Sequence, residues 1–113
     1  MKRDTSARFD DFLHSPVRLR ICGLLNNADK VEFQILRATL ELTDAHLSKN
    51  VKALIDGGYV AAEKRASQAR GDARRLTWLS LTPQGRTAFE RHYRALNEIA
   101  SGGFAPDGAA SGR

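Results

Sequence analysis

Two short amphipathic segments, separated by a tight turn, constrain the fold of this sequence more than any other feature. Apolar residues recur at helical spacing in both, at Phe33, Leu36 and Leu40 and then at Leu47, Val51, Leu54 and Ile55. The turn falls at residues 41–42, and Thr43 can cap the second segment, which ends at Gly57-Gly58. The pattern predicts helices over residues 33–40 and 43–56 that pack against each other across the turn.

The rest of the sequence predicts further helices and one β-hairpin. Ser15-Pro16 and Thr82-Pro83 each combine a capping side chain with a proline at the first helical position. Alternating apolar residues on either side of a basic stretch are typical of a hairpin. The predicted elements are a short helix over 8–13, a helix over 16–26, an extended piece over 30–32, strands over 59–65 and 76–81 around a tip at 66–75, and a helix over 83–100.

This order of elements predicts a chain that is mainly α with a small β-hairpin, an α+β winged helix-turn-helix with a long C-terminal helix. With 113 residues, of which 42% are hydrophobic, the chain is expected to form one domain. We expect that domain over residues 8–100, between a flexible N-terminus at 1–7 and a disordered tail at 101–113 that is rich in Gly, Ala and Ser.

Four stretches carry a resemblance to a known family. They are His14-Ser-Pro-Val-Arg-Leu-Arg-Ile, Leu42-Thr-Asp-Ala-His-Leu-Ser-Lys-Asn-Val-Lys-Ala-Leu, Gly57-Gly-Tyr-Val and Leu81-Thr-Pro-Gln-Gly-Arg. In this order and spacing they resemble the short winged-helix transcriptional regulators related to the MarR and ArsR groups, over about residues 8–100. The resemblance implies a homodimer, a recognition helix over 43–56 that enters the DNA major groove, and a wing that reaches the adjacent backbone or minor groove. At residues 68–75 the basic residues of the family's wing tip are present but its proline is absent.

The residues of the predicted recognition helix and wing suit contacts with DNA. Small Ala45 allows a close approach, while Lys49 and Lys52 can meet phosphate or guanine. Ser48 matches a family position that often contacts phosphate, and Arg70 at the wing tip suits a narrow minor groove. The alternative for the lysines is an ordinary solvated helix face. The candidate DNA contacts are Thr43, Asp44, Ala45, His46, Ser48, Lys49, Asn50, Lys52, Arg70, Arg74 and Arg75.

The last predicted helix has a longer apolar stripe than its own small core needs. A lone protomer would expose part of that stripe, so we predict a dimer seam, with packing inside the monomer as the alternative. A small-molecule effector at this seam is a further candidate partner. The predicted seam residues are Phe9, Phe12, Leu13, Phe89, Tyr93, Leu96 and Ala100.

Several classes of protein are not indicated by the sequence. There is no paired nucleophile and base, no phosphate-binding glycine loop and no cluster of metal ligands, so we expect no enzyme, metal site or cofactor. Cys22, the single cysteine, lies on an apolar helix face, where packing is favoured over a redox switch. The polar N-terminus lacks a secretory signal, and no apolar run could span a membrane, so a cytoplasmic protein is expected.

The net positive charge of the chain is consistent with a polyanionic partner such as nucleic acid. The formal charge is +5 and the isoelectric point is about 9.9. Arg18 and Arg20 are expected to be ordinary surface or ion-paired residues rather than phosphate contacts. The sequence therefore predicts a sequence-specific regulator that binds double-stranded DNA as a dimeric repressor. A protein-interaction module and a non-specific architectural DNA-binding protein are the alternatives.

Overall fold

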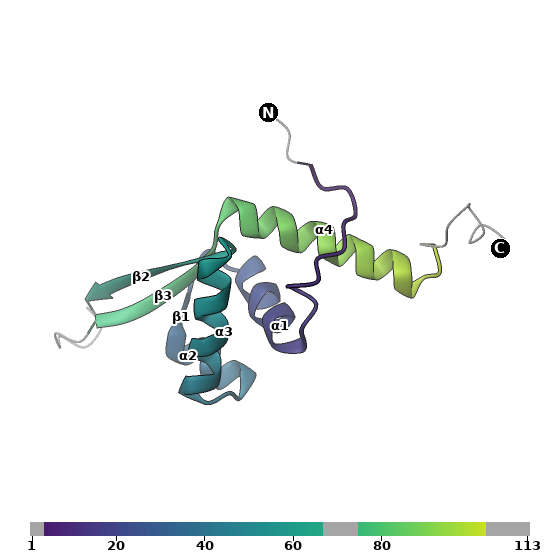
Figure 1. The fold of residues 1–113 in the computed structure, drawn as a ribbon. Coiled ribbons are helices and arrows are strands. Elements are labelled where there is room, and N and C mark those ends of the chain that lie inside the picture. The colour runs from purple at the N-terminus through teal and green to yellow at the C-terminus, as the bar shows by residue number, and fades with distance from the viewer. Residues whose placement is uncertain (1–3, 67–74, 104–113) are drawn as a thin grey trace.

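The computed structural model describes residues 4–66 and 75–103, and it has the predicted α+β architecture (Figure 1). In the described part of the chain, four helices pack against a small antiparallel sheet. The elements are α1 (Pro16–Asn26), β1 (Val31–Glu32), α2 (Phe33–Leu40), α3 (Asp44–Asp56), β2 (Val60–Ala66), β3 (Arg75–Leu81) and α4 (Pro83–Ala100). The β2–β3 hairpin and the far end of α4 extend from opposite sides of the body, which gives the structure an elongated shape of 61 × 35 × 23 Å.

Each helix begins where a side chain can bind a free backbone N–H group. Ser15 and Thr82 cap α1 and α4 ahead of their prolines, as predicted, and Thr43 Oγ1 accepts from the N–H of His46 at 3.0 Å. The carboxylate of Glu32 caps α2. Glu41 then takes a left-handed conformation, φ 57°, which turns the chain sharply between α2 and α3.

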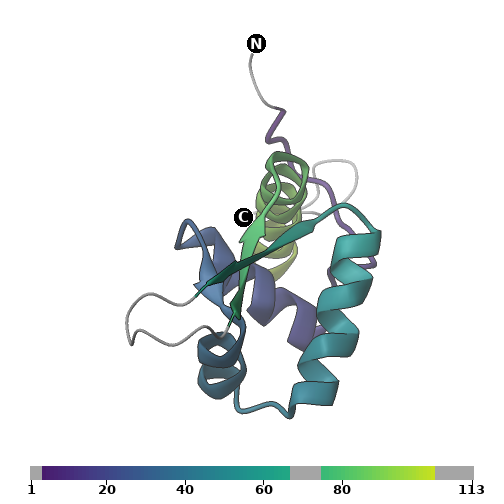
Figure 2. The same cartoon turned by 90° about the vertical axis from the view of Figure 1, so that its left-hand side faces the viewer.

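The sheet contains three strands in the order β1-β3-β2. The brief extended piece after α1 pairs Val31 with Leu79, and the hairpin pairs Val60 with Leu81. Val60, Leu79 and Leu81 are buried, whereas the rest of β2 is exposed. The wing tip, with Arg70 and Arg74, lies outside the described residues. Seen from the hairpin end (Figure 2), α3 stands beside the sheet, α2 lies below it, and α1 and α4 lie behind it.

One core holds these elements together. Its central members are fully buried residues of α1, α2, α3 and β3, and α1 contacts each of the other helices. The buried apolar residues are Leu13, Ile21, Cys22, Leu25, Leu36, Leu40, Leu47, Val51, Leu54, Val60, Leu79 and Leu81.

The predicted helix over residues 8–13 is wrong, because this segment is an extended strap that ends in a turn. We call residues 4–13 the N-terminal strap. The N–H of Arg8 donates to the carbonyl of Arg91 in α4 at 3.0 Å, so the strap's backbone is bound to α4 instead of to itself. The Asp10 carboxylate closes the turn by accepting from the N–H groups of Phe12 and Leu13, at 2.9 and 3.2 Å. A six-residue helix has too few internal hydrogen bonds to compete with these contacts.

For two apolar residues the observed burial is the reverse of the predicted one. Leu13, expected in the dimer seam, is fully buried in the protomer's own core because the strap turns inward there. It therefore offers no surface to a second copy. Ile55, expected in the core, is 38% exposed because it sits in the last turn of α3, which faces the sheet across a groove.

Residues at both ends of the described part of the chain contact α4. Ser6, which belongs to the end expected to be flexible, accepts a hydrogen bond from Arg91 at 2.9 Å through its carbonyl. Ser101 to Gly103 close α4 with a turn in which the Gly103 N–H donates to the carbonyl of Glu98. Residues 104–113, the rest of the expected tail, lie outside the described residues.

The first turn of α4 is packed directly against the turn after α3. A Cβ atom on Gly85 would lie within 2.7 Å of the carbonyl carbon of Tyr59 and would overlap its oxygen. Thr82 holds the same turn, since its N–H donates to the Tyr59 carbonyl at 3.0 Å and its hydroxyl to the Gly58 carbonyl at 2.7 Å. Only glycine allows this close approach between backbones.

We predict that Gly85→Ala destabilises the fold by about 1–3 kcal/mol, because the added methyl group must displace backbone that cannot move freely. Gly23→Ala is the matched control: its Cβ would meet only the Phe89 ring at 3.8 Å, an ordinary contact. Replacing this glycine within α1 should stabilise the fold by about 0.5–1 kcal/mol. Urea denaturation of both variants measures these changes, and equal stabilities would contradict the close packing at Gly85.

Candidate nucleic-acid interface

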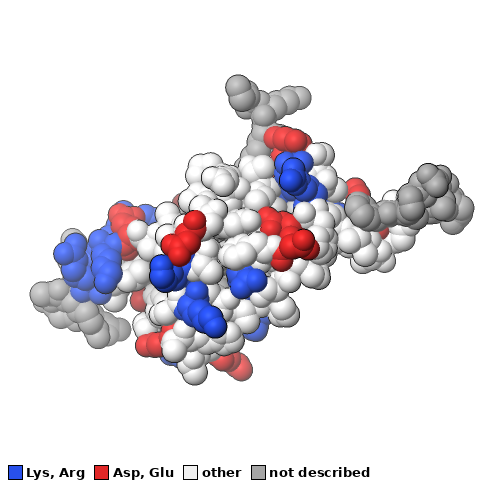
Figure 3. Space-filling view, in the orientation of Figure 1, with Lys and Arg blue, Asp and Glu red and all other residues white. Residues whose placement is uncertain are grey.

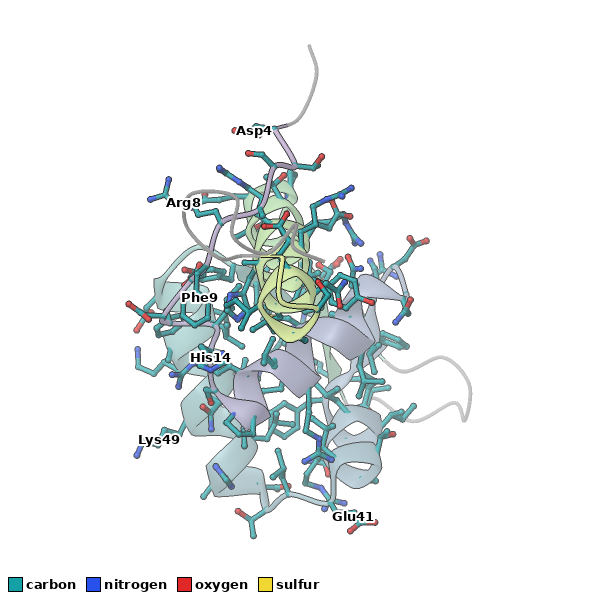
Figure 4. All side chains as sticks on the ribbon, turned by 90° about the vertical axis from the view of Figure 1, so that its right-hand side faces the viewer. Asp4, Arg8, Phe9, His14, Glu41 and Lys49 are labelled. Carbon is teal, nitrogen blue, oxygen red and sulfur yellow. The ribbon has the colours of Figure 1, made fainter. Side chains whose placement is uncertain are left out.

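The outward face of α3, with its capping residue Thr43, carries seven of the eleven predicted contacts. Leu47, Val51 and Leu54 hold the other face in the core. Figure 4 shows Lys49 pointing away from the body of the molecule, well separated from the strap residues Arg8 and Phe9. The exposed residues of this face are Thr43, Asp44, Ala45, His46, Ser48, Lys49 and Lys52.

The charges on α3 are balanced. Asp44 pairs with Arg37 of α2 at 3.2 Å, and Lys52 pairs with Asp56 one turn further along at 3.1 Å. Lys49 takes part in none of the ion pairs found within residues 4–66 and 75–103. Its ammonium group is therefore the best placed on this face for a phosphate, while the Lys52 pair is exposed and easily exchanged.

Asn50 was predicted as a DNA contact, and the structure corrects this. It is only 9% exposed and lies on the inner side of α3. Its Oδ1 accepts from Nη1 of Arg18 at 3.3 Å, and its Nδ2 donates to the carbonyl of His46 at 3.0 Å. Its amide is therefore committed to contacts inside the protein.

The β2–β3 hairpin adds cations beside α3. Lys64, Arg65 and Arg75 are exposed. Hydrogen bonds from Arg65 and Lys30 lower the pKa of the Glu63 carboxyl, which stays ionised and offsets part of this charge. Figure 3 shows basic side chains gathered over the hairpin and over the face that α3 occupies, with acidic side chains between the two groups.

Strand alternation decides which of these cations face α3. Ala62 and Thr77 line a groove of about 440 Å³ between the sheet and α3, together with Ser48. Lys64 lies two residues from Ala62 and is paired with Thr77, so it shares their face of the sheet, and Arg75 does so too. Lys64 was missed as a candidate contact. Its place in the alternating strand, two residues after Ala62, could have indicated it.

The predicted seam residues divide into two groups. Phe12 packs within the protomer, stacked on Tyr59 at 5.2 Å between ring centres, and Phe9 contacts His92 at 4.8 Å. Towards the end of α4, Tyr93 is 56% exposed. Phe89 and Leu96 are half-buried, and Ala100 is exposed.

The described part of the chain contains no assembled redox or metal site. Burial raises the pKa of the Cys22 thiol to about 12, so the reactive thiolate is suppressed. Within residues 4–66 and 75–103, no three potential metal ligands come together. No helix described here is long and apolar enough to cross a membrane.

An exposed helix face beside a basic hairpin is the arrangement of a winged helix, and the comparison with protein families agrees. Residues 17–100 match the family described as winged helix DNA-binding domain. The chain belongs to this family. Its members bind DNA and the similar structures are transcriptional regulators, so the family is not one of enzymes.

Two relatives match this chain over most of their own length, and a third has the same fold in part of a longer chain. An uncharacterised protein of Methanocaldococcus jannaschii is 33% identical over 87 residues, which cover 77% of this chain and 90% of the relative. The structure of a transcriptional regulator homologue from Pyrococcus horikoshii OT3 is 26% identical with a TM-score of 0.74, covering 85% of this chain and 91% of that one. A MarR family transcriptional regulator from Silicibacter pomeroyi has the same fold, with 24% identity and a TM-score of 0.62, over 86% of this chain and 63% of that one.

His92 joins α4 to the strap. Its Nδ1 accepts from the N–H of Asp10 at 2.9 Å, and its ring lies 5.5 Å from that of His14. Its Nε2 is buried without a hydrogen-bond partner among the described residues. Burial, and secondarily His14, lower the pKa of His92, while Asp10 and Asp11 act in the opposite direction.

We predict that the fold loses stability as the pH falls below about 6.5, the ordinary pKa of histidine, because the unfolded chain then takes up a proton that the folded His92 refuses. His92→Gln keeps an acceptor for the Asp10 N–H and should flatten this dependence. His46→Gln, which removes an exposed histidine, should leave it unchanged. Urea denaturation at about pH 8 and about pH 5 compares the variants. A dependence retained in His92→Gln would rule out His92 as its source.

Proposed function

We propose that this protein is a sequence-specific transcriptional regulator that binds double-stranded DNA as a homodimer and represses by occupying its site. The observation that carries the proposal is the exposed face of α3, with Lys49 and Ser48, beside the strand face that bears Lys64 and Arg75. In this arrangement α3 enters the major groove and the wing reaches the neighbouring backbone or minor groove. Arg70 and Arg74 are proposed to extend the contact from the wing tip.

The end of α4 supports the dimer. Figure 1 shows that this helix extends beyond the rest of the body, and Tyr93 and Ile99 there are 56% and 46% exposed. A second copy packed along Phe89, Tyr93 and Leu96 would remove this apolar surface from water. Two-fold symmetry would then present two recognition helices to half-sites about 34 Å apart, one turn of DNA.

A small-molecule effector beside the seam is also part of the proposal. A groove of about 680 Å³ lies between α1, the end of α2 and α4, with Phe89 and Tyr93 on one wall and Leu24 and Leu40 among its apolar lining. This volume is in the usual range for small-molecule sites. Its position next to the seam would let an occupant influence how two protomers meet.

The experiment that tests the proposed function is selection of bound duplexes from a random pool, followed by titration of the best duplex at two salt concentrations. We expect the selection to yield a palindromic duplex that the protein binds with an affinity far above that for bulk DNA. Equal affinity for all duplexes would indicate architectural binding instead. No binding to any duplex would contradict the DNA-binding function and favour a protein-interaction module.

We predict that Lys49→Ala weakens binding and reduces the slope of log affinity against log salt by about 1, because one phosphate contact is lost. The matched control is Arg94→Ala, which removes one exposed positive charge from α4. The control should leave the slope unchanged. Binding measured by fluorescence anisotropy at several salt concentrations gives both slopes, and an unaltered slope in Lys49→Ala would exclude the contact.

We predict that Leu96→Asp converts the dimer to a monomer, because the seam would have to bury an unpaired carboxylate. Asn97→Asp introduces the same charge at an exposed position of the same turn and should remain dimeric. Sedimentation velocity measures the mass of both variants. A dimeric Leu96→Asp protein would show that copies of the chain meet elsewhere.

A further inference from the structure

Arg18 is held in one orientation at the joint between α1 and α3. Its Nε donates to the carbonyl of Phe12 at 2.7 Å, and its Nη1 donates to Oδ1 of Asn50 at 3.3 Å. The guanidinium carbon also lies 4.4 Å from the centre of the Phe12 ring. The backbone of Arg18 is fixed in turn, because its N–H binds the capping hydroxyl of Ser15. Two of the five N–H donors of this side chain and one face of its guanidinium are therefore used inside the protein.

Asn50 carries this contact to the end of α3 that is proposed to enter the major groove. The Asn50 amide, held by Arg18 through its oxygen, donates through its nitrogen to the carbonyl of His46 at 3.0 Å. His46 belongs to the first turn of α3 and is exposed. A side chain of α1 is thus connected by two successive hydrogen bonds to the first turn of the recognition helix.

The remaining contacts between α1 and α3 do not fix the rotation of α3 so strictly. They involve apolar side chains such as Leu47, Val51 and Leu54, and apolar packing has little directional preference. Within residues 4–66 and 75–103, the bond between Arg18 and Asn50 is the one hydrogen bond that joins α1 to α3. A hydrogen bond requires alignment of donor and acceptor, so this contact restricts how α3 can turn about its own axis.

We propose that Arg18 is a positioning residue for DNA binding. Through Asn50 it holds α3 in the rotation that presents Ser48 and Lys49 to the duplex, and it does so without touching DNA. This inference rests on the proposed function and adds to it a residue that lies outside the predicted contact surface.

The test compares Arg18→Met with the wild-type protein on the duplex that the wild type selects. Loss of a positioning hydrogen bond from a charged group should weaken binding about tenfold or more. The slope of log affinity against log salt should stay the same, because no phosphate contact is lost. Asn50→Ala should cause a similar loss, and the double variant should bind no worse than either single one, since both remove the same contact. Arg18→Lys, which keeps the charge but cannot reach both acceptors at once, should recover only part of the affinity.

Arg94→Met is the matched control, because it removes the same charge from an exposed position of α4 and should leave the affinity unchanged. Circular dichroism establishes that each variant is folded, and Asn50→Ala tests the contact from its other side if Arg18→Met does not fold. A wild-type affinity in both Arg18→Met and Asn50→Ala would overturn the assignment, as would a salt slope reduced by about 1, which would make Arg18 a phosphate contact. Failure of the wild-type protein itself to bind any duplex would overturn the proposed function as well.

Discussion

The arrangement of the helices and the hairpin depends on the contacts that Tyr59 makes in the turn after α3. Its backbone carbonyl accepts from the N–H and hydroxyl of Thr82, at 3.0 and 3.3 Å, and Gly85 allows α4 to pack directly on it. Its ring stacks on Phe12, and its hydroxyl donates to the Asp10 carboxylate at 2.9 Å. Burial and this hydrogen bond raise the pKa of Tyr59 to about 12, so the phenol remains a donor across the physiological range. The end of α3, the start of the hairpin, the start of α4 and the strap therefore meet at one residue, which fixes the wing relative to the recognition helix.

The two elements of the candidate interface, α3 and the β2–β3 hairpin, differ in charge. The formal charges of Asp44, Lys49, Lys52 and Asp56 on α3 sum to zero, and Asp44 and Asp56 are paired with Arg37 and Lys52. The hairpin supplies the cations instead, with Lys64 and Arg75 on the face that continues the groove beside α3. In the proposed complex, counterion release driven by the wing would add affinity for any duplex, whereas contacts from α3 would distinguish one sequence from another.

Most of the fold could be predicted because its determinants are local. The caps at Ser15, Thr43 and Thr82 and the apolar periods between them set the helix boundaries within a residue or two. The errors fall where distant contacts override local pattern. The strap reads as a helix from its own residues, yet its backbone binds α4, and Leu13 follows it into the core. Asn50 looks like a polar surface residue until Arg18, 32 positions earlier, is known to lie beside it. Most exposed residues of α3 were correctly predicted because helical periodicity alone separates its two faces.

The buried polar groups of this protein contribute orientation more than net stability. Asp10 receives hydrogen bonds from Phe12, Leu13 and Tyr59 and donates its own N–H to His92 of α4, while Arg18 links the Phe12 carbonyl to Asn50 of α3. Strap, α1, α3 and α4 are therefore joined by directional bonds around a core that is otherwise apolar. Such bonds add little net free energy, but leaving one partner buried and unpaired is costly. Alternative rotations of α3 or displacements of α4 would leave these groups unpaired, so the polar contacts select one arrangement among the several that apolar packing alone would tolerate. In the proposed complex, base recognition by α3 comes from the placement of its side chains, and it therefore depends on this selection of one arrangement.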